Sequence, residues 1–269
     1  MGLFEKKYCD FCGEKIGLLG NRKLEDGNMC KNCAAKLSPW FSDRRRSTKS
    51  DIQAQLDYRE QNKGRVASFN ATKTIGKHTK LMIDEGAKTF MVTSARDLTS
   101  ANPDVLDFSQ LIGCNLEINE DRNELKQKDA SGNYVSYTPP RYEYSYDFGV
   151  KIQVNNPYFN EMSFDISDGS VSTGEKKMNM NEVPSAGGGW TVHSSDSSSD
   201  LGEYYECISI GNEIKASVEQ MKAQAQGGSQ PLPQEQAAPQ PKPAVTCPSC
   251  GATTVPDANG CCEYCGAKL

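Results

Sequence analysis

Histidine is scarce in this sequence of 269 residues, which has only His78 and His193. No H-E-x-x-H, G-x-x-x-x-G-K-[ST], G-x-G-x-x-G or G-x-S-x-G pattern is present, so the common zinc-protease, phosphate-binding and serine-nucleophile sites are not indicated. Cys114 could pair with a histidine, but nothing in the sequence brings the two together, and a lone cysteine is more often an inert buried thiol. We therefore expect a protein that is not an enzyme.

Long apolar runs are also missing. No stretch approaches the roughly 18 apolar residues of a membrane-spanning helix, and the N-terminal MGLFEKKYCDFCG lacks the apolar segment of a secretory signal. Hydrophobic residues make up only 36% of the chain, so part of it should lie outside a compact core. These absences favour a cytosolic protein.

Cysteine, in contrast, is abundant. Nine of the eleven cysteines form clusters near the two ends of the chain, and Cys114 and Cys207 stand alone between them. Because the cytosol keeps thiols reduced, metal ligands are expected rather than disulfides. The first cluster has the spacing C-x2-C-x17-C-x2-C, which is typical of a tetrahedral zinc site. Its predicted ligands are Cys9, Cys12, Cys30 and Cys33.

The residues around these cysteines predict a small zinc module over residues 1–46. Gly13 follows the first cysteine pair, where a tight turn often needs a positive φ. Glycine and Asp-Gly turn signals between the pairs predict a hairpin, and the second pair enters a short helical pattern that Pro39 ends. This order describes a treble-clef or zinc-ribbon module.

The second cluster contains an internal repeat that selects its ligands. CPSCGA at 247–252 is echoed by CEYCGA at 262–267, whereas using Cys261 in place of Cys262 would break the match. A four-cysteine site has no open position for water, so both predicted zinc ions are structural. The predicted ligands of the second ion are Cys247, Cys250, Cys262 and Cys265. Metal binding would supply most of the folding free energy of this ribbon, residues 244–269.

A connecting helix is predicted over residues 47–65. Thr48 and Asp51 form a capping-box pattern, and an apolar face with Ile52 continues until Gly64, where we expect the helix to end. A run of three arginines, residues 44–46, precedes this helix and is interpreted as a solvated stretch.

Residues 66–222 have the pattern of short antiparallel strands followed by one amphipathic helix. Segments such as LMIDE, TFMVTS, NLEINED, YSYDFGVKIQV and MSFDIS are rich in β-branched and aromatic residues and are separated by turn signals. The helix stripe contains Tyr204, Ile208, Ile214, Val218 and Met221. We expect a bent sheet or partial barrel with this helix across an open end. Residues 223–243 are rich in Gln, Pro and Ala and are predicted to be a disordered linker.

Several of these stretches resemble known families. The stretch CDFCGEKIGLLGNRKLEDGNMCKNCAAKLSPWF resembles the N-terminal zinc-binding domain of an uncharacterised bacterial family, catalogued as a domain of unknown function. VLDFSQLIGCNLEINEDRNE is similar to the central strands of bacterial pleckstrin-homology-like (PH-like) domains, and the tail is similar to a widespread bacterial zinc ribbon. The resemblance implies an α+β multidomain protein with a PH-like domain over 66–222, and it implies no reaction.

The distribution of charge along the chain distinguishes between possible classes of partner. Residues 1–46 contain ten Lys or Arg and six Asp or Glu, whereas residues 47–222 contain 18 and 26. Nucleic-acid binding through a basic face of Arg22, Lys23 and Arg44–Arg46 is one alternative, which the acidic middle segment disfavours. Anionic-lipid binding by the PH-like domain is another. Its predicted anion site consists of Lys73, Lys77, His78 and Lys80.

The function that these patterns favour is a zinc-binding, non-enzymatic cytosolic adaptor. A sheet edge or groove of the PH-like domain would receive a protein partner, and the two zinc modules would add contact surfaces. Because the second ribbon is tethered by a flexible linker, two weak contacts together would give useful avidity.

Overall fold

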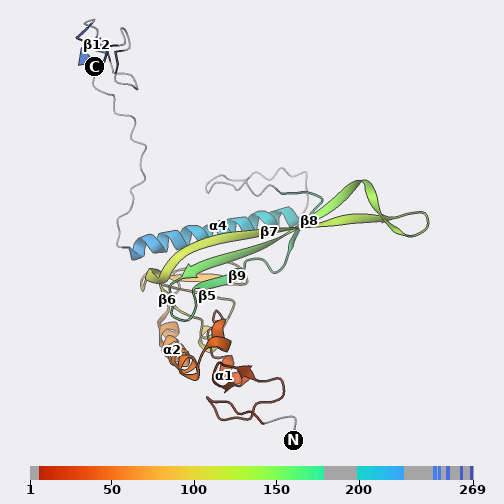
Figure 1. Ribbon diagram of the computed structural model, residues 1–269. Coiled ribbons are helices and arrows are strands. Elements are labelled where there is room, and N and C mark those ends of the chain that lie inside the picture. The colour runs from red at the N-terminus through yellow and green to blue at the C-terminus, as the bar shows by residue number, and fades with distance from the viewer. Residues whose placement is uncertain are drawn as a thin grey trace. The chain divides into compact units, whose positions relative to one another are not determined.

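In the computed structural model of the protein (Figure 1), residues 6–178 and 199–226 are described, together with the short stretches 245–246, 248–249, 253–254, 261–262 and 267–268. The chain divides into two compact units, Met1–Gly228 and Ser229–Leu269. None of the helices in the described ranges has the length and apolar character that crossing a membrane requires.

The N-terminal part of the first unit is a small module built around a hairpin. β1 (Arg22–Lys23) pairs antiparallel with β2 (Asn28–Met29), and the short helix α1 (Lys31–Ala34) and the 3-10 turn η1 (Asp43–Arg46) follow. Leu24 and Met29 are fully buried in its core. The predicted hairpin and short helix are confirmed.

Helix α2 (Lys49–Ser68) connects this module to the rest of the unit. The predicted capping box is present, with the Thr48 side chain accepting from the Asp51 N–H and the Asp51 carboxylate accepting from the Thr48 N–H. The expectation that Gly64 ends the helix is wrong. The helix continues because Val66 is buried against Met91 and Val105, and this packing outweighs the roughly 1 kcal/mol helix penalty of glycine.

Two four-stranded antiparallel sheets form the body of the first unit. The first sheet has the order β3 (Lys73–Ile75), β4 (Lys80–Asp84), β5 (Thr89–Thr93) and β6 (Leu106–Asp107). Between β5 and β7 lie the short helix α3 (Leu98–Ala101) and the 3-10 turn η2 (Phe108–Gln110). In the second sheet, β8 (Tyr134–Val154) pairs with β7 (Leu111–Lys128), β9 (Glu161–Asp165) and β10 (Val171–Gly174). The expected antiparallel strands are therefore present, and the PH-like assignment stays a prediction.

Helix α4 (Ser199–Ala225) packs on both sheets. The predicted stripe is confirmed, because Tyr204, Ile208, Ile214, Val218 and Met221 are all buried in the main core. The helix lies along β7 and also contacts β8, β10, η2 and β3 (Figure 1). The helix thus covers the sheets lengthwise, because its apolar stripe extends over most of its 27 residues. The expected position was across an open end of the sheet.

The β7–β8 hairpin extends beyond the end of α4 as a projecting arm, residues 121–143 (Figure 1). Its strands pair with each other from Asp121 to Lys128, with a register shift between Leu125 and Lys126. Most arm residues are exposed, so the arm has no core of its own.

Candidate metal centre

The first cysteine pair is held by a tight turn. Cys9 is 2% exposed, and its carbonyl accepts a hydrogen bond from the N–H of Gly13 at 2.8 Å. Gly13 has φ +72°, the left-handed conformation that the sequence predicted at this position. The turn is closed by an antiparallel bridge between Tyr8 and Lys15.

The second pair is positioned by α1. Cys30 is the N-cap of this helix, and its sulfur accepts a hydrogen bond from the N–H of Cys33 at 3.3 Å. The N–H of Cys30 in turn donates to the sulfur of Cys9, also at 3.3 Å. The bond from Cys30 to Cys9 joins the second cysteine pair to the first.

Asp10 also links the two cysteine pairs, and the sequence analysis missed it. Its carboxylate accepts from the N–H of Asn28 at 2.6 Å, and its own N–H donates to the Asn28 carbonyl at 3.0 Å. Asp10 follows a ligand, and Asn28 precedes Cys30 by two residues, so the bonds hold the two ligand segments together. The sequence feature that could have indicated this contact is an acidic residue between the first two cysteines of the cluster.

The four sulfurs of Cys9, Cys12, Cys30 and Cys33 lie within 4.8 Å of one another. The sulfurs of Cys12 and Cys30 are 3.7 Å apart. Tetrahedral zinc with bonds of about 2.3 Å to sulfur requires sulfur separations of about 3.8 Å. The chemistry and the spacing of the donors therefore fit a zinc ion, and four protein ligands would leave no position for a water.

The thiols of the cluster differ in acidity. Burial raises the pKa of Cys9, but hydrogen bonds from the backbones of Cys30, Phe11 and Cys12 outweigh it and lower this pKa to about 6. At Cys33, burial and the neighbouring thiols raise the pKa. A dication bound between the sulfurs would relieve the mutual repulsion of clustered thiolates.

The C-terminal cysteine cluster lies mostly outside the described residues, since Cys247, Cys250 and Cys265 are among those not described. In the part that is described, β11 (Val245–Thr246) pairs with β12 (Thr253–Thr254), and Cys262 donates its N–H to the carbonyl of Ala267 at 2.7 Å. Cys262 is buried, whereas Cys261 is partly exposed. The second zinc ion and its ligands stay predictions.

Of the residues weighed as a nucleophile pair, Cys114 and His78 are among those that the structure describes. Cys114 is buried in the core on β7, and burial raises its pKa to about 11. His78 is exposed in the turn between β3 and β4, where its Nδ1 lies 3.6 Å from a carboxylate oxygen of Asp168. His193 lies outside the described residues.

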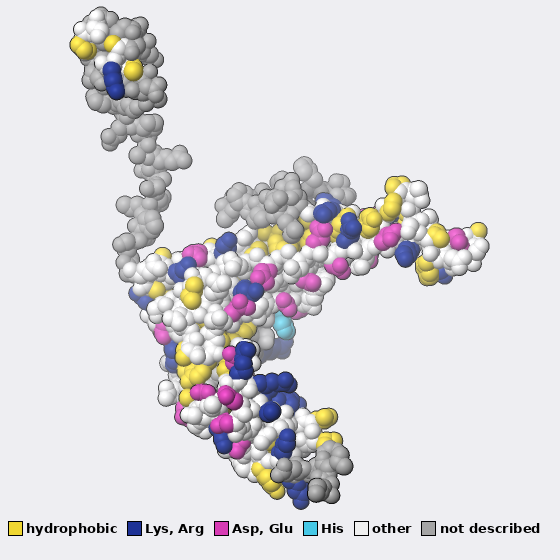
Figure 2. Space-filling model, in the orientation of Figure 1, with side chains coloured by type: hydrophobic (Ala, Val, Ile, Leu, Met, Phe, Trp, Pro, Cys, Tyr) yellow, Lys and Arg dark blue, Asp and Glu magenta, His cyan; other side chains and the backbone are white. Residues whose placement is uncertain are grey.

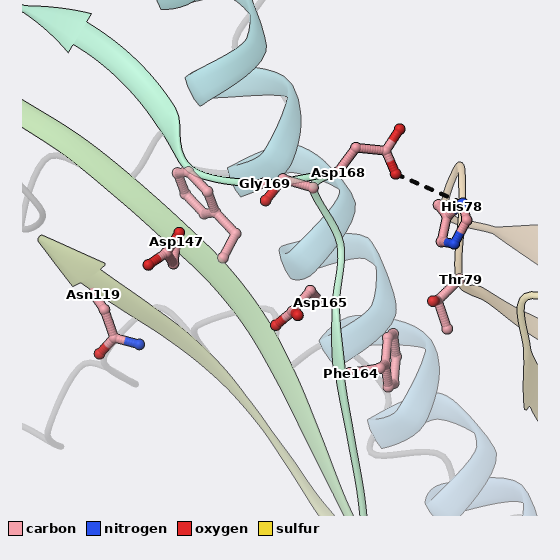
Figure 3. Close-up of a pocket in the computed structure, with 10 residues that line it drawn as sticks. His78, Thr79, Asn119, Asp147, Phe164, Asp165, Asp168 and Gly169 are labelled. Atoms are coloured by element: carbon pink, nitrogen blue, oxygen red, sulfur yellow. Dashed lines mark ion pairs between the residues drawn. The ribbon is translucent and has the colours of Figure 1, made fainter. Parts of the chain in front are cut away.

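The predicted anion site around the β3–β4 turn is largely neutralised. Lys73 lies 3.1 Å from the carboxylate of Glu213, and Lys77 lies 2.5 Å from that of Glu206. A cavity of about 750 Å³ opens next to this turn (Figure 3), and three carboxylates are among the residues that line it. They belong to Asp147, Asp165 and Asp168. The surface around this turn is therefore acidic and does not suit an anionic lipid.

The site and its small supporting core define a cysteine-rich module at the N-terminal end of the first unit, whose four sulfurs could hold a metal ion. Residues 7–55 match a family model described as Domain of unknown function (DUF4428). The matched region contains all four cysteines of the cluster and ends within α2. No curated protein and no solved structure matches the chain.

Proposed function

We propose that this chain is a zinc-binding, non-enzymatic adaptor of the cytosol. The observation that carries the proposal is the convergence of Cys9, Cys12, Cys30 and Cys33 into a four-sulfur cluster. A zinc ion with four thiolate ligands has no open coordination position, so its role is to hold a surface in place and not to activate water. Function then lies on the surfaces of the module and the body.

The arm is the surface that we propose for protein partners. Three aromatic–cation pairs lie along it, with Arg122 4.5 Å from the ring of Tyr142, Arg141 4.9 Å from Tyr137 and Lys128 5.3 Å from Tyr134. Tyr and Arg are the residue types that dominate binding energy at protein interfaces, and tyrosine loses little conformational entropy on binding. Each basic group restrains a ring before any partner arrives.

The charge of the arm favours a protein partner over nucleic acid or an anionic membrane. Residues 121–143 contain four Lys or Arg and four Asp or Glu, so the arm has no net charge. Nucleic-acid and anionic-lipid surfaces both select clustered positive charge. A balanced surface with exposed tyrosine suits a protein.

Metal analysis tests the zinc part of the proposal. Native mass spectrometry of the full chain should find two zinc ions, with one lost in Cys9→Ser and one lost in Cys262→Ser. Cys261→Ser is the matched control and should retain both ions. A chain that binds no zinc would refute the proposal.

Site-specific photocrosslinking tests the partner surface. A photoreactive residue at Tyr134, which is 69% exposed, should give one defined protein adduct in cells, whereas the same residue at Ile112, 54% exposed on β7, should not. The Tyr134 adduct should weaken in a variant with Arg122→Gln and Arg141→Gln. Equal labelling at both positions would argue against the arm as a docking surface.

A further inference from the structure

The turn between the first cysteine pair and β1 carries two exposed leucines. The N–H of Gly20 donates to the carbonyl of Gly17 at 3.0 Å, which closes a β-turn with Leu18 and Leu19 at its two central positions. Leu18 is 82% exposed and Leu19 is 88% exposed, the highest values among the large apolar side chains of the described residues.

This turn breaks the usual rule for its central positions. Those positions favour Gly, Pro, Asn, Asp and Ser, because these residues suit the backbone geometry and the contact with water. Two leucines contribute nothing to the folded core here, and their exposure to water is unfavourable. Residues that break the usual turn preferences and add nothing to the stability of the fold are expected at functional positions.

Basic side chains surround the base of the leucine turn. The guanidinium of Arg22 donates to the carbonyl of Leu19 at 3.3 Å, and that of Arg44 donates to the carbonyl of Lys23 at 2.5 Å. Burial, and then the positive charges of Arg22 and Arg45, lower the pKa of Arg44. On the face shown in Figure 2, Lys and Arg side chains gather on the N-terminal module.

These positive charges are not compensated. Among the described residues, no carboxylate forms an ion pair with Arg22, Lys23, Arg44 or Arg45. Lys73 and Lys77 beside the β3–β4 turn, in contrast, are paired with glutamates. The N-terminal module therefore combines unpaired positive charge with an exposed apolar turn.

We propose that the Leu18–Leu19 turn and its basic base form a site for reversible attachment to an anionic membrane surface, which goes beyond the proposed adaptor function. The leucine side chains enter the boundary between headgroups and acyl chains, while Arg22, Lys23 and Arg45 attract anionic headgroups. Nucleic acid is the weaker alternative, because single-stranded nucleic acid is held by aromatic stacking and leucine supplies none.

The zinc site gives this attachment its geometry. Cys12 and Cys30 are the ligands on either side of the segment with the leucine turn, and their sulfurs are 3.7 Å apart. The bound ion fixes both ends of this loop. An ordered loop presents its apex with little further loss of entropy on binding.

Vesicle cosedimentation of the zinc-loaded full chain tests the proposal. The protein should bind phosphatidylcholine vesicles that contain phosphatidylserine, and should bind much less to phosphatidylcholine alone. The variant with Leu18→Ser and Leu19→Ser should bind about tenfold or more weakly, since each inserted leucine contributes apolar burial. Both substitutions introduce a residue that turns favour, so the fold is retained, which zinc content and circular dichroism would verify.

A second variant separates charge from apolar insertion. Lys23 and Arg45 have no side-chain hydrogen bond or ion pair among the described residues, so Lys23→Gln with Arg45→Gln should weaken binding and reduce its salt dependence without altering the turn. Matched controls on the sheet body are Ile112→Ser for the leucines and Lys80→Gln with Arg96→Gln for the charges, and these should bind like the wild type.

Two results would overturn the proposal. One is vesicle binding that the leucine substitutions leave unchanged. The other is a failure to bind vesicles with phosphatidylserine, whether or not the protein shifts a short RNA or DNA. Neither result would affect the zinc stoichiometry on which the adaptor function rests.

Discussion

A buried ion pair joins the N-terminal module to the body, and removing one partner should be severely destabilising. Arg59 on α2 lies 2.7 Å from the carboxylate of Asp104, and their side chains are 6% and 0% exposed. Arg59 also donates to the carbonyl of Lys36 in the N-terminal module at 3.2 Å, and Ser38 donates to Asp104 at 2.8 Å. The variant Arg59→Met keeps most of the apolar volume and removes the positive charge.

The expected loss in the free energy of unfolding is about 3–5 kcal/mol, because Asp104 would remain buried as an uncompensated carboxylate with one hydroxyl donor. Burial already raises the pKa of Asp104, and Arg59 opposes that effect. Without Arg59 the folded-state pKa should rise further above its unfolded value. The destabilisation should therefore be largest at neutral pH and should decrease as the pH falls toward this raised pKa.

Urea unfolding followed by circular dichroism, with zinc present, would measure the effect. Lys63→Met is the matched control in the same helix, because it breaks an exposed ion pair with Glu60 and should change the free energy by less than about 1 kcal/mol. Adding Asp104→Leu to Arg59→Met should recover part of the loss, since apolar residues often replace a buried pair well. The reasoning fails if Arg59→Met is no more destabilising than Lys63→Met.

Three further predictions concern the metal, the lone thiols and acid. Removing zinc with a chelator should abolish hydrogen-exchange protection around Leu24 and Met29 and preserve it in the sheets, because the sheets share a separate core. Cys114 and Cys207, whose pKa burial raises to about 11, should resist alkylation at pH 8 until the protein unfolds; rapid labelling of the native protein would contradict this. N–H donors from Ala87 and Asn70 lower the pKa of Asp84, so its stabilisation should be present above the unfolded pKa and be lost as the pH falls through the folded one. Asp84→Asn should accordingly be destabilised at pH 7 and approach the wild type near pH 3 in thermal melts.

Local features of this protein could be predicted from the sequence, whereas contacts between distant segments could not. The Thr48–Asp51 capping box and the stripe of α4 depend on residues a few positions apart, and the cysteine cluster is indicated by a known motif spacing; all are present. The Arg59–Asp104 pair joins residues 45 positions apart, and no pattern indicates such a contact. The position of α4 along β7 likewise depends on the path of the whole chain.

The arm shows a different limit of sequence patterns. The inner strands are predicted from runs of β-branched and aromatic residues between turn signals, whereas most of residues 121–143 are exposed in the structure and were not predicted as strands. Pro139 and Pro140 also argue against a strand, because proline lacks the N–H that pairing requires. The structure continues β8 through both prolines, with the register shift beside them.

Those same prolines have a consequence for how the protein avoids self-association. An exposed two-stranded ribbon can template the addition of strands from other molecules, which leads to aggregation. Along the arm, Pro139 and Pro140 remove two backbone donors, and Lys126 and Lys128 place charge on the opposite strand. The arm can therefore extend into solvent and expose its tyrosines to a partner without promoting strand pairing between copies of the protein.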